Sequence, residues 1–316
     1  MRYRILGKTG LKVSEIGFGC WEIGGGKWDS SDEKARESLM RAADMGVNFF
    51  DTAFSYGKGH SEMLVGELAK EHEIIVATKI PPKSKLFPFV DRNDIENVFP
   101  EKHILEFAKK SYENLGKKTI DILQLHLWKD NWTEETCWME AFEKIRDEGI
   151  ANHFGVSVNN HEPNSAVKLV KSGKIETVQV IYNIFDQSPE NELFEACKKN
   201  NVGVIARCPF DEGSLAGFLS EKTKFSDWRE RYFTQDRLKE VVKRVEALRW
   251  LENKNRTLAQ AALQFCLHHK AVSTVIPGST SSKHAEENAK ACEGELTAEE
   301  LKKLKSHRWI RNFYAK

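Results

Sequence analysis

Short apolar runs alternate with amphipathic stretches along almost the whole chain. The runs are rich in Val, Ile, Leu and Phe, whereas the stretches between them repeat apolar residues at helical spacing. Continuous apolar runs are typical of parallel strands that are covered on both faces. The pattern therefore predicts eight core strands with helices between them. The strands are expected at residues 15–19, 47–51, 74–79, 120–126, 153–157, 177–180, 203–207 and 271–276.

Eight strands separated by helices favour a closed parallel (β/α)8 barrel, the TIM barrel, within the α/β class. The main alternative is a doubly wound nucleotide-binding sheet, which requires G-x-G-x-x-G after the first strand. Here Gly17-Phe18-Gly19 is followed by Cys20-Trp21-Glu22, without the third glycine. We therefore predict one barrel domain over residues 1–316, with a β-hairpin at residues 4–14. Long loops are expected at the carboxyl rim, above all residues 209–236, where such loops usually bind or cover ligands.

Composition excludes several classes of function. The net charge is +1, which gives no electrostatic reason to expect nucleic acid or an anionic membrane surface as a partner. No apolar stretch has the length of a membrane span, and the first residues lack the apolar region of a signal peptide. Six cysteines without C-x-x-C spacing predict free thiols in a cytoplasmic protein. The histidines lack metal-ligand spacing, so no metal site is predicted; the sequence assigns no oligomeric state.

Four residues with reactive side chains occur at the ends of neighbouring strands. Asp51, Lys79 and His126 end the second, third and fourth predicted strands, and Tyr56 follows Asp51 by five positions. The carboxyl ends of all strands meet at one rim of a barrel, so these side chains should share a cleft. A single strand-end Asp, Lys or His is more often a cap, a surface charge or a hydrogen-bonded core group. Their joint occurrence in strand order favours a catalytic site.

The four side chains suit the reduction of a carbonyl group. A phenol titrates near 10, so acting as an acid at pH 7 requires a lowering of roughly 3 units, or about 4 kcal/mol. One ammonium about 4 Å away supplies on the order of 4 kcal/mol at an effective dielectric constant of about 20. We therefore expect Lys79 to lower the pKa of Tyr56, Asp51 to orient Lys79, and His126 to hold the carbonyl oxygen. The protein has no hydride of its own, which implies a nicotinamide cofactor.

With these residues in view, the chain resembles the aldo-keto reductase family over nearly its whole length. The most specific segment is Asp51-Thr52-Ala53-Phe54-Ser55-Tyr56-Gly57, in combination with Lys79 and His126 downstream. The other matching segments are residues 17–19, 77–79, 125–126, 154–157, 179–183, 276–279 and 287–288. The resemblance implies a (β/α)8 barrel that binds NADPH, with a catalytic tetrad of Asp51, Tyr56, Lys79 and His126.

The resemblance also implies cofactor contacts. Ser157 and Gln179 match positions that hydrogen-bond the nicotinamide carboxamide, and Arg207 stands where many members stack an aromatic ring on the nicotinamide. A guanidinium can also lie flat on a ring. The loop from Pro209 to Gly217 matches the segment that wraps the pyrophosphate. The full set of expected cofactor contacts is Trp21, Ser157, Gln179, Arg207, Pro209, Gly213, Ser214, Leu215, Gly278, Ser279, Lys283, Glu287 and Asn288.

The segment after the last strand leaves the choice of cofactor open. Many NADPH-using members have a Lys or Arg here for the 2′-phosphate, and this chain has Lys283 among serines but lacks the usual arginine. The alternative is an ordinary helix N-terminus with Ser282 as its cap. We expect NADPH, with NADH as the alternative.

Aromatic residues after the first, second and fourth strands are expected to surround a small-molecule carbonyl substrate. They are Trp21, Trp28, Phe54 and Trp128, and Trp309, Phe313 and Tyr314 lie near the C-terminus. For Trp309, packing in the core is an equal alternative. The expected activity is NADPH-dependent reduction of an aldehyde or ketone, with Tyr56 as the general acid. The alternatives are oxidation of a sugar or polyol by NAD(P)⁺, and a cofactor-binding regulatory subunit like the potassium-channel β subunits, which resemble these reductases.

Overall fold

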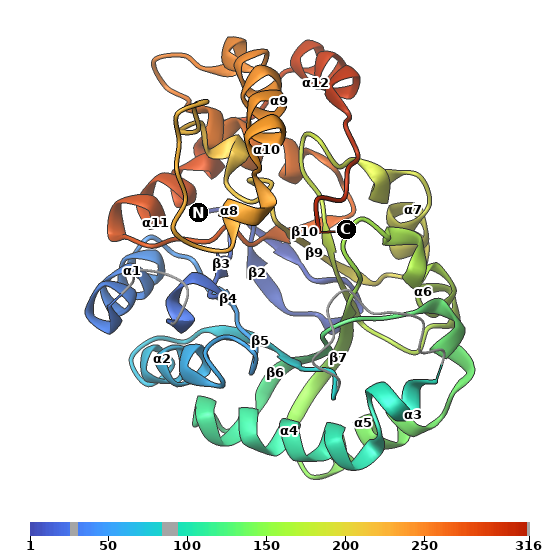
Figure 1. Cartoon of the computed structure of the whole chain (residues 1–316). Helices are drawn as coiled ribbons and strands as arrows, with labels where there is room; N and C mark the ends of the chain where they lie inside the picture. Colours follow the sequence, from blue (N-terminus) through green and yellow to red (C-terminus); the bar gives the residue numbers. More distant parts are fainter. Residues whose placement is uncertain (26–30, 84–93, 315–316) are drawn as a thin grey trace.

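The computed structural model describes residues 1–25, 31–83 and 94–314. Eight parallel strands form a nearly closed barrel that helices surround on the outside (Figure 1). The predicted fold class is therefore confirmed. The barrel strands are β3 Phe18–Gly19, β4 Phe49–Asp51, β5 Ile75–Ile80, β6 Ile120–Leu125, β7 Ala151–Ser157, β8 Thr177–Ile181, β9 Gly203–Arg207 and β10 Val272–Val275.

The barrel closes where its first strand meets its last. Each strand from β3 to β10 pairs in parallel with the next, and two isolated parallel bridges, Ile16 to Val275 and Gly19 to Gly278, join the two edges. The Gly17 amide donates to the Val275 carbonyl oxygen at 2.8 Å. A Cβ on Gly19 would lie 2.9 Å from the Ile276 carbonyl oxygen, so the backbones can approach only because this residue is glycine.

Helices lie between successive strands and bury their apolar faces against the barrel. In the first of them, the Ser31 side chain accepts a hydrogen bond from the Lys34 amide, and Ala35, Leu39 and Ala42 face the core. The helices are α1 Asp32–Asp44, α2 His60–Leu68, α3 Ile95–Val98, α4 Glu101–Leu115, α5 Cys137–Asp147, α6 Val167–Ser172, α7 Leu193–Lys199, α8 Arg229–Tyr232, α9 Gln235–Glu246, α10 Leu258–His268, α11 Ser282–Ala289 and α12 Ala298–Leu304.

The predicted N-terminal hairpin closes the amino end of the barrel. Strands β1 Tyr3–Ile5 and β2 Lys12–Ser14 pair antiparallel. Leu6, directly after β1, and Val13 of β2 are fully buried in one cluster with the strand residues Phe49, Ala77, Ile122 and Ile205. The hairpin therefore covers the amino end of the barrel, opposite the carboxyl rim.

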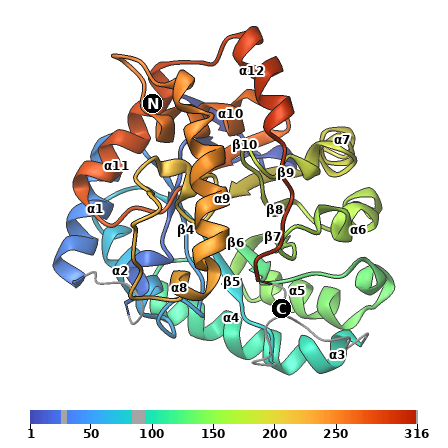
Figure 2. The ribbon, with the colours of Figure 1, turned by 45° about the horizontal axis from the view of Figure 1, so that its top comes forward.

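The long segment after β9 and the C-terminal segment cover one side of that rim. The chain after α12 runs past α9 (Figure 2), and its Tyr314 ring lies 4.8 Å from the ring of Tyr232 in α8, between centroids. It brings the Tyr314 ring to 6.0 Å from the Trp228 ring, between centroids, and the Phe313 carbonyl oxygen to 3.0 Å from the Arg237 guanidinium. Among the described residues, no helix is both long enough and apolar enough to cross a membrane. All six cysteines are free thiols, as expected.

Candidate active site

The structure brings Asp51, Lys79 and Tyr56 into direct contact at the carboxyl rim. Asp51 ends β4 and Lys79 lies near the end of the neighbouring strand β5. The Lys79 ammonium lies 2.6 Å from a carboxylate oxygen of Asp51, 2.8 Å from the Thr52 carbonyl oxygen and 3.3 Å from the Tyr56 hydroxyl. Lys79 is completely buried and Asp51 is 2% exposed, so this ion pair is shielded from water. Strand order therefore creates the predicted cluster.

The His126 ring lies beside the Tyr56 ring at the carboxyl rim. It follows β6, and its ring centroid lies 5.9 Å from that of Tyr56 in an edge-to-face arrangement. The Ser55 hydroxyl lies 3.3 Å from His126 Nδ1. Burial, together with the positive charges of Lys79 and Arg207, holds the pKa of His126 well below its ordinary value. The imidazole is therefore neutral near pH 7 and has one N–H to donate.

The electrostatics of Tyr56 differ from the expectation of a strongly acidic phenol. Burial raises the pKa of Tyr56, and the Asp51 carboxylate raises it further, so the lowering by Lys79 does not prevail. The pKa of Lys79 itself is raised: burial opposes the charge, but Asp51 and Tyr56 outweigh it. The expected lowering of the Tyr56 pKa by Lys79 does not prevail because burial opposes it, and Asp51 adds to the effect of burial. Tyr56 is consequently a protonated phenol at neutral pH.

The ends of β7, β8 and β9 add three polar side chains to the same rim. Ser157 and Gln179 are register partners, and the Gln179 amide donates to the second carboxylate oxygen of Asp51 at 2.7 Å. Ser157 is 3% exposed, and its hydroxyl forms no hydrogen bond within the described part of the chain. A hydroxyl without a partner, beside an amide, fits an amide-bearing ligand such as a nicotinamide.

The Arg207 side chain is held in place by hydrogen bonds to uncharged groups. Its guanidinium donates to the Val158 carbonyl oxygen and the Asn160 side-chain oxygen, both at 2.9 Å. Its Nε is buried without a partner, and none of the described residues forms an ion pair with it. The charges of the Asp51–Lys79 pair offset each other and His126 is neutral, so Arg207 adds a positive charge beside the tetrad.

The loop after β9 has an unusual backbone conformation. Cys208, Asp211 and Glu212 have positive φ angles of 52°, 49° and 58°. The Ser214 hydroxyl donates to Asp211, and Leu215 is fully buried. Pro209 is also buried, and Gly213 has a φ of 97°. Of the expected cofactor contacts in this loop, Gly213, Ser214 and Leu215 can therefore offer backbone groups rather than side chains.

The segment after β10 uses most of its polar side chains internally. The Ser279 hydroxyl lies 3.1 Å from the Ser38 hydroxyl and donates to the Ser281 carbonyl oxygen at 3.0 Å. Asn288 donates to the Gly278 carbonyl oxygen at 3.3 Å, and Lys283 is largely exposed with its ammonium 3.8 Å from Glu287. The cap of α11 is Ser281 rather than the expected Ser282, because the Ser281 side chain accepts from the His284 amide.

The aromatic residues expected at the substrate pocket separate into two groups. Trp21 is 39% exposed, and its ring centroid lies 6.4 Å from that of Tyr56; the Phe54 ring packs edge-on against Phe107 at 4.7 Å. Trp128 is instead fully buried between the rings of Trp132 and Trp138. The structure therefore corrects Trp128 from a pocket residue to a core residue. Trp28 lies outside the described residues.

Sequence reasoning missed Glu22, Trp228 and Arg229 at this rim. The Trp228 ring lies 5.5 Å from the Trp21 ring, and Glu22 packs against Gly278. Trp228 and Arg229 belong to the long loop that was expected at the rim, but nothing in a loop sequence indicates which residues fold back over the site.

Trp309 packs against Phe185 and Arg311, which favours the core interpretation for this residue.

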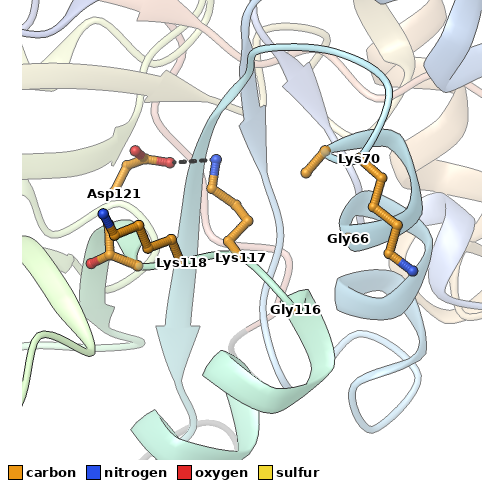
Figure 3. Close-up of a pocket in the computed structure, with 8 residues that line it drawn as sticks. Gly66, Lys70, Gly116, Lys117, Lys118 and Asp121 are labelled. Atoms are coloured by element: carbon orange, nitrogen blue, oxygen red, sulfur yellow. Dashed lines mark ion pairs between the residues drawn. The ribbon is translucent and has the colours of Figure 1, made fainter.

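A separate hollow of about 390 Å³ lies at the opposite end of the barrel (Figure 3). It is lined by the end of α2 and by the turn between α4 and β6, including Lys70, Gly116, Lys117 and Asp121. Lys117 is held by Asp121 at 3.2 Å and by the Ile74 carbonyl oxygen at 2.6 Å. The hollow lacks the tetrad, so the carboxyl rim remains the candidate active site.

Among the described residues, no group of three or more His, Cys, Asp or Glu residues is placed to hold a metal ion.

The fold and the site together define a (β/α)8-barrel protein with a buried Asp–Lys pair, a phenol and a neutral imidazole at its carboxyl rim. The model of the Aldo/keto reductase family matches residues 15–308. An uncharacterized oxidoreductase, YqkF of Bacillus subtilis, is 31% identical over 313 residues, which cover 97% of this chain and 96% of YqkF. The chain therefore belongs to the aldo/keto reductase family. Membership of this family identifies it as an oxidoreductase.

Two solved structures are similar to the whole barrel. One is the aldo-keto reductase AKR11C1 from Bacillus halodurans in its holo form, with a TM-score of 0.77 and 28% identity over 98% of this chain and 96% of that one. The other is the glycerol dehydrogenase AKR11B4 from Gluconobacter oxydans, with a TM-score of 0.79 and 25% identity over 96% of this chain and 94% of that one. Members of the family generally use NAD(P)H and act on small carbonyl compounds.

Proposed function

We propose that the protein is a cytoplasmic, NADPH-dependent reductase that converts an aldehyde or ketone to an alcohol, carried by a single barrel domain over residues 1–316. The observation that carries this proposal is the contact of the Lys79 ammonium with both Asp51 and the Tyr56 hydroxyl. Free thiols fit a reducing compartment.

Tyr56 serves as the general acid. It is protonated at neutral pH, because burial and Asp51 raise its pKa. As negative charge develops on the substrate oxygen, Tyr56 donates its proton there, and the adjacent Lys79 ammonium stabilises the resulting phenolate. Asp51 holds Lys79 charged and in place, so it is a positioning residue. His126, being neutral, donates a hydrogen bond to the same substrate oxygen.

The residues present fit a nicotinamide cofactor, which supplies the hydride when bound. The unpartnered Ser157 hydroxyl and the Gln179 amide would hold the carboxamide, and Arg207 would contact the nicotinamide ring. Trp21, Gly213, Gly278 and the other expected contacts around the rim would hold the rest of the cofactor. The preference for NADPH rests on the family resemblance alone. The Ser279 hydroxyl is hydrogen-bonded within the protein and Lys283 is largely exposed, so neither residue adds support for binding of the 2′-phosphate. Equal affinity for NADH and NADPH would show that Lys283 does not bind the 2′-phosphate.

The test of the proposal has two stages. Quenching of tryptophan fluorescence by NADPH and NADH measures cofactor binding, and the absorbance of the reduced nicotinamide then reports turnover of aldehydes, ketones and polyols. Tyr56→Phe keeps the ring and removes the donated proton, so reduction should fall by about 10²–10⁴-fold while cofactor affinity stays the same. Tyr112→Phe is the matched control, since its hydroxyl reaches only the Lys118 carbonyl oxygen at 3.5 Å. Unchanged turnover in Tyr56→Phe would exclude Tyr56 as the acid.

Oxidation of a polyol is the second candidate, favoured by similarity to a glycerol dehydrogenase over nearly the whole chain. The same four residues would serve, but oxidation needs Tyr56 as a phenolate. The raised pKa of Tyr56 therefore favours reduction at neutral pH and oxidation only at alkaline pH. A regulatory subunit without turnover would show cofactor binding in the first stage and no substrate consumption in the second.

A further inference from the structure

The first turn of α2 carries two polar side chains that are fully buried, Ser61 and Glu62. A helix that packs on the outside of a barrel normally buries apolar side chains there. The proposed mechanism gives neither residue a role. Buried polar groups are nearly always hydrogen-bonded, so the partners of these two side chains show what they hold in place.

Their partners lie at the ends of three consecutive barrel strands. The Ser61 hydroxyl donates to the Cys20 carbonyl oxygen, directly after β3, at 2.8 Å and accepts from the Thr52 hydroxyl, directly after β4, at 2.9 Å. One carboxyl oxygen of Glu62 accepts from the Thr78 hydroxyl of β5 at 2.6 Å. Thr52 and Thr78 are themselves fully buried. One helical turn is thus bonded to the ends of β3, β4 and β5.

The second carboxyl oxygen of Glu62 bonds to another helix. It accepts from the Asn114 side chain of α4 at 2.8 Å. Asn114 lies against Gly59, where a Cβ would stand 2.3 Å from the side-chain nitrogen of Asn114. Gly59 is the residue before α2 and has a φ of 94°. The two oxygens of one carboxyl group therefore hold the start of α2, one against β5 and the other against α4.

Two of the strand residues in this network adjoin the buried ion pair of the tetrad. Thr52 follows Asp51, and Thr78 precedes Lys79. Successive side chains of a strand point to opposite faces, so the threonines face α2 where Asp51 and Lys79 face the barrel interior. The Thr52 carbonyl oxygen also accepts from the Lys79 ammonium at 2.8 Å. The network therefore holds the same strand ends that carry the ion pair.

Tyr56 lies on the loop that joins Thr52 to Ser61. The hydrogen bond between the hydroxyls of Thr52 and Ser61 closes this loop at its base, and the Ser61 amide donates to the Tyr56 carbonyl oxygen at 3.2 Å. The position of the phenol therefore depends on where the first turn of α2 lies relative to β4 and β5. Apolar surfaces can slide past each other, whereas a buried hydrogen bond is costly to leave unmade and so fixes this position.

We propose that Glu62 is a positioning residue for the general acid: its carboxyl group fixes the start of α2 against β5 and thereby holds the Tyr56 hydroxyl within reach of Lys79. Ser61 supports the same placement through β3 and β4. The inference rests on the proposed function, because that function gives Tyr56 the role of the acid.

The placement needs hydrogen bonds at position 62 and not a charge. In Glu62→Gln the side-chain oxygen can accept from Asn114 and the amide can donate to the Thr78 hydroxyl, so both contacts are kept. Glu62→Met has a similar length and removes both contacts. Positioning therefore predicts that Glu62→Gln behaves as the wild type does, whereas Glu62→Met does not. A direct effect of the Glu62 charge on the tetrad predicts instead that both variants lose activity.

The first measurement is reduction of 4-nitrobenzaldehyde by NADPH with the full-length protein. Because a misplacement of about 1 Å can cost about 10²-fold in rate, kcat of Glu62→Met should fall by about 10- to 100-fold. The KM for the aldehyde and the Kd for NADPH should stay at the wild-type values, because the substitution lies outside the rim. Gln264→Met is the matched control: it removes a buried side chain of α10 that bonds the Ala291 carbonyl oxygen at 3.1 Å, beside Arg4 of the hairpin. Its kcat should not change.

The Tyr56→Phe background separates positioning from general damage to the fold. Without the donated proton there is no acid to position, so Glu62→Met should cause no further loss of kcat in that background. An equal loss in both backgrounds overturns the proposal. Thr78→Val is the second variant, should Glu62→Met fail to fold. It removes one partner of Glu62 with little change in volume, and its kcat should likewise fall only where Tyr56 is present.

Crystal structures of the wild type and the variants test the geometry without an activity assay. In Glu62→Met the Tyr56 hydroxyl should lie farther from the Lys79 ammonium than its present 3.3 Å, and in Glu62→Gln the separation should be kept. The proposal is overturned by an unchanged separation in Glu62→Met, or by a loss of kcat in Glu62→Gln as large as that in Glu62→Met. Unchanged kcat in Tyr56→Phe, or a wild type that reduces no aldehyde or ketone, refutes the proposed function instead, and the crystal structures still decide whether Glu62 positions Tyr56.

Discussion

Replacement of Lys79 by methionine tests the electrostatic role of the buried ammonium. Methionine keeps most of the side-chain volume and removes the charge that lies 3.3 Å from the Tyr56 hydroxyl. At this separation and an effective dielectric constant of about 20, the ammonium stabilises a phenolate by about 5 kcal/mol, equivalent to between 3 and 4 pKa units. Loss of Lys79 also leaves Asp51 unpaired, so Asp51 is expected to take up a proton.

The two effects of the substitution have opposite signs for Tyr56. Loss of the ammonium raises the pKa of Tyr56, and neutralisation of Asp51 lowers it, because both groups contribute to the present value. Lys79 is the larger of the two causes, so the net result is a higher pKa. Alcohol oxidation, which needs the phenolate, should therefore require a higher pH in Lys79→Met than in the wild type. Reduction should be slower at every pH, because the phenolate that forms is less stable.

The assay is the pH dependence of kcat in both directions. Lys83→Met is the matched control, since Lys83 follows the same strand but is exposed. Breaking a buried ion pair costs about 3–5 kcal/mol of stability, so urea unfolding must show that the variant is folded under assay conditions. A slower enzyme whose oxidation profile stays at the wild-type pH would refute the reasoning, because it would show that Lys79 does not act on the pKa of Tyr56.

Three further predictions test other parts of the structure. Arg207→Leu should raise the pKa of His126, which Arg207 helps to lower, and so move the acidic limb of the reduction profile to higher pH; an unmoved imidazole resonance in an NMR titration would contradict this. Arg311→Leu should lower the free energy of unfolding by about 3–5 kcal/mol, because it leaves the buried carboxylate of Asp211 unpaired, and a second change, Asp211→Leu, should restore part of the loss in urea melts. Gly203→Ala should lower the melting temperature, because its Cβ would lie 2.6 Å from Leu6 Cδ1 in the hairpin that closes the barrel; Gly173→Ala is the control without a steric clash, although its φ of 76° adds backbone strain.

Much of the fold and the catalytic cluster could be predicted from the sequence because both depend on local order. Apolar runs separated by amphipathic stretches define strands and helices, and a parallel barrel places consecutive strand ends side by side. Asp51, Lys79 and His126 therefore converge in the structure as strand order required. The hairpin was predictable for the same reason, since its two strands are adjacent in the chain.

The tertiary structure decided the properties that depend on residues far apart in the chain. The sequence places an ammonium beside Tyr56, but burial sets the direction of the pKa shift, and burial comes from the whole rim. Trp128 has the sequence position of a pocket residue and enters the core because Trp132 and Trp138 fold around it. Glu22 meets Gly278 only because the first and last strands close the barrel, a contact between residues that no local pattern relates.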